Sequence, residues 1–206
     1  MPIDHVILVV DDLDVAMRRF DDDYGLASYR GGRHVGMGTA NAIVPLGPNY
    51  VELLAVVDPD EAATNPNGRA MLSLTEAGGG LAGWMMRTDD LDREAARLGL
   101  TVISMSRRRP DGLELHWRLG LGDAAPRDPS LPTFIQWDVP SSLLPGAEAV
   151  AHRVRPTGIA WLEVSGDAAR VEQWVGRPDF DVRVTQGEPA VERVALAVDG
   201  GVIVLE

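Results

Sequence analysis

The stretch IDHVILVVDDLD at residues 3–14 returns as LAGWMMRTDDLD at residues 81–92, and this repeat decides the fold. In each copy an apolar run ends in DDLD, and the amphipathic segment that follows ends at a glycine, Gly25 or Gly99. The apolar runs predict buried strands, the aspartates suit the N-cap and first turn of a helix, and glycine suits its end. The sequence therefore contains the same strand-helix unit twice.

Three strand-like segments separated by turn residues follow each helix. They are ASYRGG (27–32), ANAIVPL (40–46) and YVELLAVV (50–57) in the first copy, and TVISMS (101–106), LELHWRL (113–119) and TFIQWDV (133–139) in the second. A weaker third copy begins at GIAWLEVSGD (158–167) and continues through one helical and three strand-like segments. We therefore predict an α+β protein of βαβββ modules at 1–58, 81–140 and 157–206, with linkers at 59–80 and 141–156.

Composition excludes several classes of function. The 206 residues carry a formal net charge of −12, the 19 basic residues are all arginines, and cysteine is absent, so lysine Schiff bases and thiolate nucleophiles are excluded. Phosphate neutralisation needs a basic face, so no nucleic-acid partner is expected, and the densest cationic run, Arg107–Arg109, is typical of a solvated turn. The sequence contains no apolar stretch of about 18 residues, so no membrane partner is expected. The start MPIDHV does not resemble an export leader, which favours a cytoplasmic location.

The paired modules, with DHVILVVDDLD (4–14) at the start of the first and YVELLAV (50–56) at its close, resemble the vicinal oxygen chelate superfamily. Together with the C-terminal module, the chain is similar to the glyoxalase-like domain proteins of that superfamily, and the resemblance covers nearly the whole chain. It implies that modules one and two form half-barrels of mixed sheet that face each other, with helices on the outer face. It also implies metal ligands on the first and fourth strands of each module, and a small-molecule ligand in the cavity.

His5 and Glu52 occupy the implied ligand positions of the first module. Each is a polar residue in an otherwise apolar strand, and strand alternation places His5 on the face of Ile7 and Glu52 on the face of Tyr50. A buried carboxylate needs a cation, an arginine or a hydrogen-bonding partner. Two interpretations stay open: a metal ion that both residues share, or a metal-free hydrogen bond between the imidazole and the carboxylate.

The second module departs from the pattern of the superfamily. The residue that matches His5 is Gly83, which has no side-chain ligand, and the residue that matches Glu52 is Gln136, a neutral oxygen donor. The resemblance therefore implies that His5, Glu52 and Gln136 hold one weakly bound divalent ion, such as zinc, nickel, manganese or iron, with a vacant position for water or substrate oxygens.

The segment LELHWRL offers two further candidates, because alternation places His116 and Arg118 on one face. If this face lines the cavity, His116 joins Glu52 as a group that moves protons, and Arg118 binds an anionic part of the substrate. If it faces water, both are ordinary surface residues, as is typical of a polar-apolar alternation.

Aromatic residues and the remaining histidines complete the candidates. Tyr50 and Trp84 are candidates for contact with a substrate in the cavity, although packing in the core is the alternative for the strand tryptophans Trp84, Trp117 and Trp137. Trp137 follows Gln136 and should point to the opposite face. His34 and His152 lie in polar, loop-like stretches and are expected to be exposed.

Three functions stay open. The first is a metal-dependent lyase or isomerase that polarises vicinal oxygens of a substrate while Glu52 or His116 moves a proton. The second is non-catalytic binding of a small, antibiotic-like molecule. The third is an extradiol-type dioxygenase, for which His116 must supply the second histidine. The apolar strands of the third module predict either a homodimer joined through third modules or packing of this module within the chain.

Overall fold

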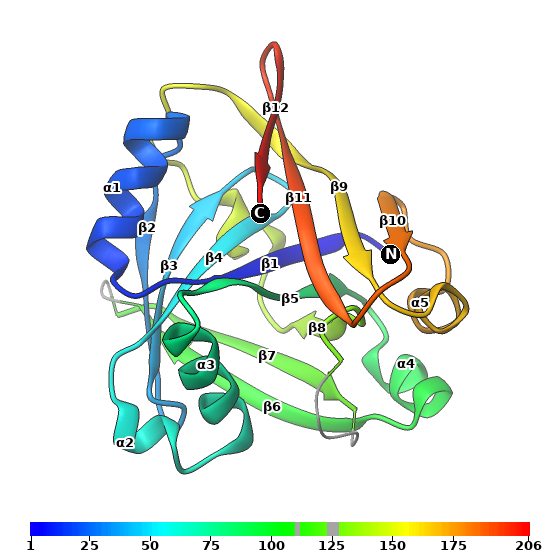
Figure 1. The fold of residues 1–206 in the computed structure, drawn as a ribbon. Coiled ribbons are helices and arrows are strands. Elements are labelled where there is room, and N and C mark those ends of the chain that lie inside the picture. The colour runs from blue at the N-terminus through cyan, green and yellow to red at the C-terminus, as the bar shows by residue number, and fades with distance from the viewer. Residues whose placement is uncertain (110–111, 123–127) are drawn as a thin grey trace.

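Residues 1–109, 112–122 and 128–206 are described by the structure, a computed structural model (Figure 1). An eight-stranded mixed sheet has the strand order β2-β3-β4-β1-β5-β8-β7-β6. Its strands are β1 (Ile3–Val9), β2 (Tyr29–His34), β3 (Thr39–Pro45) and β4 (Tyr50–Val56) from the first module, and β5 (Gly80–Arg87), β6 (Thr101–Arg108), β7 (Glu114–Leu121) and β8 (Thr133–Trp137) from the second. The predicted α+β class is confirmed.

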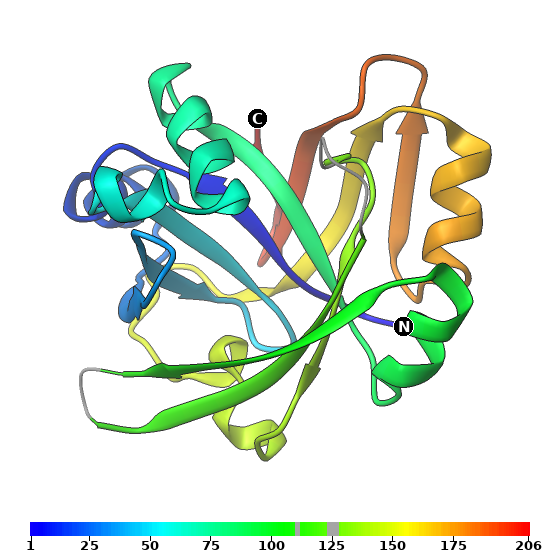
Figure 2. The same cartoon turned by 90° about the horizontal axis from the view of Figure 1, so that it is seen from below.

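The sheet consists of two similar halves that meet at β1 and β5. Strand β1 is parallel to β4, and β5 is parallel to β8, whereas β1 and β5 are antiparallel to each other. The sheet curves until its two edge strands, β2 and β6, contact each other, and Figure 2 shows this curvature from below. The two half-barrels therefore enclose one space between them, as predicted.

The helices that follow β1 and β5 begin and end where the repeat predicts. They are α1 (Leu13–Tyr24) and α4 (Leu91–Leu98). The Asp12 and Asp90 carboxylates accept hydrogen bonds from backbone amides of the first turns, at 2.9 Å and 3.1 Å. Gly25 and Gly99 then end the helices in the left-handed region, with φ of 69° and 68°. Within the described ranges, no helix is both long and apolar enough to cross a lipid bilayer.

The segments between the modules are not extended linkers. Residues 59–80 contain α2 (Pro59–Ala62) and α3 (Pro66–Glu76), and α3 packs against β4 and β5. Met71 of this helix contacts apolar side chains on the concave side of the sheet. Residues 141–156 contain two single 3-10 turns. Helix α3 thus contributes to the enclosed space, which strand patterns alone do not indicate.

The third module forms its own four-stranded sheet, with the order β10-β9-β11-β12. Its elements are β9 (Pro156–Ser165), α5 (Ala168–Val175), β10 (Asp181–Thr185), β11 (Ala190–Val198) and β12 (Gly201–Leu205). The chain order is βαβββ, as predicted, but β9 lies between β10 and β11, whereas β1 and β5, the first strands of the other two modules, lie beside β4 and β8, the fourth strands. The third module is therefore not a third half-barrel of the same kind.

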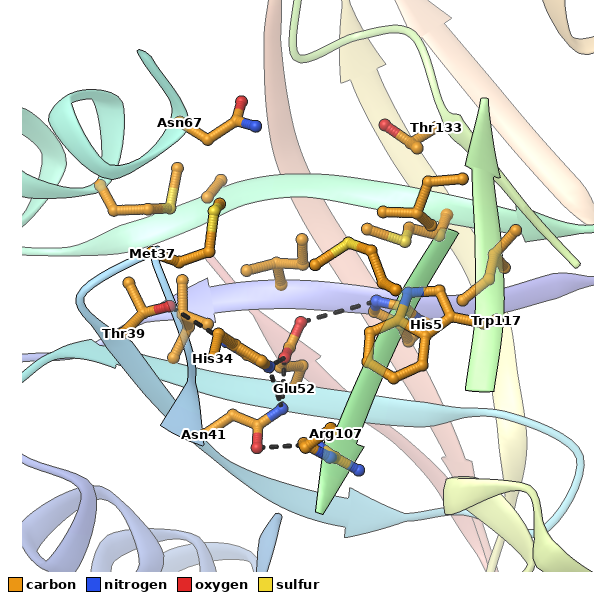
Figure 3. A pocket seen from close by; sticks show the side chains of 18 of the residues that line it. His5, His34, Met37, Thr39, Asn41, Glu52, Asn67, Arg107, Trp117 and Thr133 are labelled. Atoms are coloured by element: carbon orange, nitrogen blue, oxygen red, sulfur yellow. Dashed lines mark hydrogen bonds and ion pairs between the residues drawn. The ribbon is translucent and has the colours of Figure 1, made fainter. Parts of the chain in front are cut away.

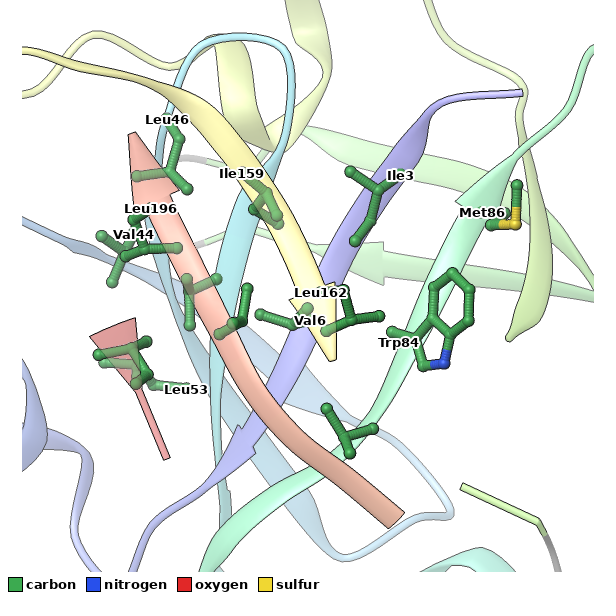
Figure 4. Close-up of a cluster of buried hydrophobic side chains, with 14 of the residues drawn as sticks. Ile3, Val6, Val44, Leu46, Leu53, Trp84, Met86, Ile159, Leu162 and Leu196 are labelled. Carbon is green, nitrogen blue, oxygen red and sulfur yellow. The ribbon is translucent and has the colours of Figure 1, made fainter. Parts of the chain in front are cut away.

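The third module covers the convex face of the large sheet. Leu162 and Leu196 of this module and Val6, Leu53 and Trp84 of the large sheet are fully buried members of one core (Figure 4). Packing within the chain is therefore the arrangement present. The argument for a homodimer through third modules loses its basis, because the apolar face that it required is already buried.

Candidate functional site

A cavity of about 170 Å³ lies on the concave side of the large sheet (Figure 3). One part of its wall is polar and consists of His5, His34, Asn41, Glu52 and Arg107, and much of the rest is made of methionine, isoleucine, leucine and tryptophan side chains. The pocket combines convergent polar groups with apolar walls, as small-molecule sites do. It is the candidate functional site.

His5 reaches the cavity from β1 and is oriented by its own neighbour, Asp4. Adjacent residues of a regular strand point to opposite faces, but the pairing of β1 with β5 is irregular here: Ile3 pairs with Met86 and His5 with Met85, which leaves Asp4 as the extra residue of a bulge. Asp4 Oδ1 accepts a hydrogen bond from His5 Nδ1 at 2.7 Å. Because an ionised carboxylate only accepts, this contact assigns the Nδ1 proton and leaves Nε2 for the cavity.

Other groups complete the support of the His5 ring. The Tyr50 ring stacks on it with a centroid distance of 4.4 Å, and Trp137 Nε1 donates to Asp4 Oδ2 at 3.0 Å. Arg87 lies 3.5 Å from the same Asp4 oxygen and balances its charge. Burial and the nearby carboxylates hold the pKa of Tyr50 well above its ordinary value, so its phenol stays protonated.

Glu52 faces His5 from β4, which lies beside β1. Its Oε2 atom lies 3.6 Å from His5 Nε2, and its Oε1 atom accepts a short hydrogen bond from Asn41 Nδ2. The Asn41 amide is fixed in turn, because its Oδ1 atom accepts from Arg107 at 2.8 Å. A continuous path of polar contacts therefore runs from His5 through Glu52 and Asn41 to Arg107.

His34 is the fifth polar group, and the expectation that it is exposed was wrong. Its Nδ1 atom lies 3.0 Å from Thr39 Oγ1, and its Nε2 atom lies 3.8 Å from Glu52 Oε1. Burial lowers the pKa of His34, while the Glu52 carboxylate acts in the opposite direction and the charges of Arg107 and His5 lower it further. His34 is therefore neutral at neutral pH.

The expectation for His152 was also incorrect, although this residue lies away from the cavity. Its ring nitrogens contact the backbone of Ala27 and of Pro45 at 3.0 Å and 2.9 Å, and the side chain is partly buried. His152 thereby connects the 141–156 segment to the first module.

Trp84 does not line the cavity, so core packing is the correct alternative for this candidate. It is fully buried in the core between the two sheets, where it packs edge-on against Phe180 and donates from Nε1 to the Ser130 carbonyl at 3.2 Å. Trp84 pairs with Val6, whose side chain also belongs to that core. Its large apolar surface therefore holds the third module against the sheet.

Gln136, His116 and Arg118 lie on the outer face of the second module. Gln136 donates to the Asp89 carbonyl at 2.9 Å and lies 3.3 Å from Arg118, and Arg118 pairs with Asp92. The His116 side chain is 54% exposed. The water-facing alternative is thus the correct one for the LELHWRL segment, and Gln136 is not brought together with His5 and Glu52.

The register of the strands explains the error at Gln136. Glu52 pairs with Ile7, two residues after His5, and Thr133 pairs with Met85, two residues after Gly83. Thr133 is therefore the counterpart of Glu52 and lines the cavity. The match of Glu52 with Gln136 is therefore three residues away from the true counterpart, and an odd shift along a strand moves a side chain to the other face of the sheet. Trp137 consequently faces the cavity.

A divalent metal does not fit the groups that the structure describes. Among those residues no three histidine or carboxylate side chains are arranged to hold one ion. At this end of the cavity the second module contributes Met85 and Thr133. The Asn41 amide nitrogen lies 3.4 Å from His34 Nε2 and donates to Glu52, so a hydrogen-bond donor occupies the space between His34 and Glu52.

Two half-barrels around a cavity with a cluster of polar side chains and mainly apolar walls elsewhere define a small-molecule-binding protein of the vicinal oxygen chelate type. The model of the glyoxalase-like domain matches residues 3–177, and the chain belongs to this family. A search of curated proteins found no match.

One solved structure shares the fold, and two others are weaker matches. A hypothetical protein from Staphylococcus aureus is 17% identical, and the match covers 100% of this chain and 98% of that one with a TM-score of 0.73. Methylmalonyl-CoA epimerase from Mycobacterium tuberculosis is 22% identical over 68% of this chain and 89% of that chain, with a TM-score of 0.46. The Streptomyces coelicolor epimerase is 21% identical over 66% and 92%, with a TM-score of 0.47. The first of these likenesses extends to the arrangement of all three modules.

Proposed function

We propose that the protein is an isomerase that removes a proton from a carbon next to a carbonyl group, with Glu52 as the base. One observation carries this proposal: Glu52 is buried, one of its oxygens is held by Asn41, and the other lines the cavity without a hydrogen bond among the described residues. A carboxylate held in this way is positioned to accept a proton from a bound substrate.

The chemical step uses groups that are already oriented. Glu52 Oε2 takes the proton, and the electron pair of the broken C–H bond moves onto the carbonyl oxygen to form an enolate. His5 in its protonated form donates from Nε2 to that oxygen, and Asp4 on the opposite side of the ring stabilises the imidazolium. Transfer of the Nε2 proton from His5 to that oxygen gives the enol, an isomer of the keto substrate. Glu52 Oε2 then returns the abstracted proton to His5 Nε2, which lies 3.6 Å away, and both groups regain their starting states.

A specific observation also favours a second candidate, binding without turnover. Met37, Met71, Met85 and Met105, four of the seven methionines, line the cavity. Methionine side chains are flexible and polarizable, and they suit the binding of varied apolar ligands. In this case His5 and Glu52 only orient the ligand.

Exchange of substrate C–H hydrogens for deuterium separates the isomerase from a protein that binds its ligand without turnover. The protein is incubated in D₂O with pyruvate, phenylpyruvate and hydroxyacetone, and NMR follows deuterium entry at carbons next to the carbonyl. We expect exchange above the buffer rate, and a loss of about 10²–10⁴-fold in Glu52→Gln, the usual contribution of a general base. Glu114→Gln is the matched control because Glu114 is exposed on β7.

Two outcomes would contradict the proposed catalysis. Full exchange activity in a folded Glu52→Gln variant would remove Glu52 as the base. Binding of these compounds with no exchange by the wild-type protein would support the second candidate instead.

A further inference from the structure

Arg107 is a buried cation without a carboxylate partner among the described residues. Its exposed fraction is 5%, and it lines the cavity from β6. The guanidinium donates from one terminal nitrogen to Asn41 at 2.8 Å, while its Nε atom is buried without a hydrogen-bond partner. No described carboxylate oxygen lies within 4.0 Å of it. Five N–H donors and a full positive charge are thus only partly satisfied.

The two arginines that follow Arg107 in the sequence each have a carboxylate partner. Arg108 pairs with Glu114 at 3.3 Å, and Arg109 pairs with Glu148 at 2.7 Å. Of the three consecutive arginines, the most buried one lacks such a pair. Removing a guanidinium from water is unfavourable unless a counter-charge and hydrogen bonds offset the lost hydration. A ligand that carries the counter-charge accounts for this arrangement.

The backbone of β2 is shaped around the guanidinium. A Cβ atom on Gly31 would lie 2.6 Å from a terminal nitrogen of Arg107 and closer still to Asn41 Oδ1, and a Cβ on Gly32 would lie 3.3 Å from Arg107 Cδ. Any side chain at Gly31 would therefore displace Arg107 or Asn41. The two edge strands meet around Arg107 at a position where β2 has no side chains.

We propose that Arg107 binds the carboxylate of a monoanionic substrate. This inference rests on the proposed function, because it names the substrate class of the same cavity. Arginine binds carboxylates through two parallel hydrogen bonds, and a ligand with a single negative charge matches the single buried guanidinium. Asn41 contacts both Arg107 and Glu52, so a carboxylate at Arg107 brings its neighbouring carbons close to the base.

The remaining walls define the other part of the substrate. Ile103, Met105, Trp117 and Leu119 line the cavity near the second module and offer no charged group. The cavity of about 170 Å³ compares with the roughly 150 Å³ cavity of another protein that holds one benzene molecule. The substrate is therefore a carboxylate, such as an oxo acid, with one ring or short branched chain as its apolar body.

A matched pair of probes tests the charge preference directly. Calorimetry compares the binding of phenylacetate with that of phenylacetamide, which has a similar shape and no charge, and phenyl phosphate serves as the other anion. We expect wild-type protein to bind phenylacetate about ten- to a hundredfold more tightly than phenylacetamide, the range for charge-assisted hydrogen bonds. Arg107→Met should bind both equally, whereas the control Arg108→Met should keep the preference.

If Arg107→Met does not fold, a second variant, Gly31→Ala, and the wild-type protein still test the proposal. Gly31→Ala should weaken phenylacetate binding by displacing Arg107 and leave phenylacetamide binding nearly unchanged. Equal binding of the two probes by wild-type protein, no binding of either at millimolar concentration, or an intact preference in folded Arg107→Met would overturn the proposal. Phenyl phosphate that binds as tightly as phenylacetate would refute the assignment to carboxylates.

The outcomes also separate this inference from the proposed function. Glu52→Gln should lose hydrogen exchange and retain the preference for phenylacetate. Preference without exchange in the wild-type protein would refute only the catalytic role of Glu52. Exchange of hydroxyacetone without a preference for carboxylates would refute only the role of Arg107.

Discussion

His34 and Glu52 are close enough to interact, yet they do not form an ion pair at neutral pH. The His34 Nε2 atom lies 3.8 Å from Glu52 Oε1. Burial lowers the pKa of His34, Glu52 raises it, and Arg107 and His5 lower it again. These are the charged groups that face His34 from the neighbouring strands. A neutral His34 leaves Arg107 as the fixed positive charge at this end of the cavity.

The lowered pKa of His34 predicts a loss of stability in acid. Unfolding returns the pKa of this residue to about 6.5. Between the folded and unfolded values the unfolded chain binds more protons, so the free energy of unfolding falls as pH falls through this range. Urea unfolding at a series of pH values should show this fall for wild-type protein and a weaker fall for His34→Gln.

The control for this prediction is His116→Gln, since the His116 side chain is 54% exposed. Its stability curve should run parallel to that of the wild-type protein. A parallel curve for His34→Gln as well would show that His34 contributes nothing to the acid sensitivity.

A cavity residue can be recognised in the sequence when its polarity differs from that of its neighbours in the same strand. His5 and Glu52 were identified because each interrupts an apolar strand, and Asn41 in ANAIVPL carries the same signal. Arg107 was missed because it belongs to a run of three arginines, which is typical of a solvated turn. The alternation of Ile103, Met105 and Arg107 on β6 indicates the inward direction once the strand is known to extend through Arg108.

At the scale of elements, the sequence predicts the strands and helices better than their register. The repeat locates the two strand-helix units because capping residues and apolar runs act locally. The position of Gln136 depends on how β8 pairs with β5, and this pairing is set by tertiary contacts. The bulge at Asp4 likewise follows from the pairing of β1 with β5, and no local signal marks it.

Gly68 offers a test of how α3 is held against its neighbour. A Cβ atom at this position would overlap the Ala62 carbonyl oxygen and lie 2.7 Å from Ala62 Cα, both of which are backbone atoms. Alanine is favoured over glycine in a helix by about 1 kcal/mol. Overpacking against backbone costs about 1–3 kcal/mol, so we expect Gly68→Ala to lower the free energy of unfolding.

Urea unfolding measures this change, with Ser73→Ala as the control on the exposed side of the same helix. The control should be neutral or slightly stabilising, because it changes helix propensity without a new contact. A more stable Gly68→Ala variant would mean that α3 moves away from α2 at no cost. Because Gly68 and Met71 both line the cavity, ligand binding should weaken along with stability.

At the scale of the whole molecule, the third module and the cavity lie on opposite faces of one sheet. Val6 and Leu53 point into the core shared with the third module, while their neighbours His5 and Glu52 point into the cavity. Strand alternation thus gives β1 and β4 a stabilising face and a functional face. The apolar content of the third module suggested an interface, but the sequence could not decide between a second chain and the same chain.

The shared core makes the molecule one cooperative unit, and this can be measured. Leu162 of the third module and Leu53 of the first are both fully buried in it. Replacing either by alanine removes buried apolar surface and leaves a void, which costs about 2–5 kcal/mol. We expect Leu162→Ala and Leu53→Ala each to lower the midpoint of a single thermal transition, whereas Val202→Ala, at a side chain that is 51% exposed, should leave it nearly unchanged. Two separate transitions, with Leu162→Ala lowering only one of them, would show that the third module folds on its own. The contact between the sheets would then not support the cavity wall, and His5 and Glu52 would depend on the first two modules alone.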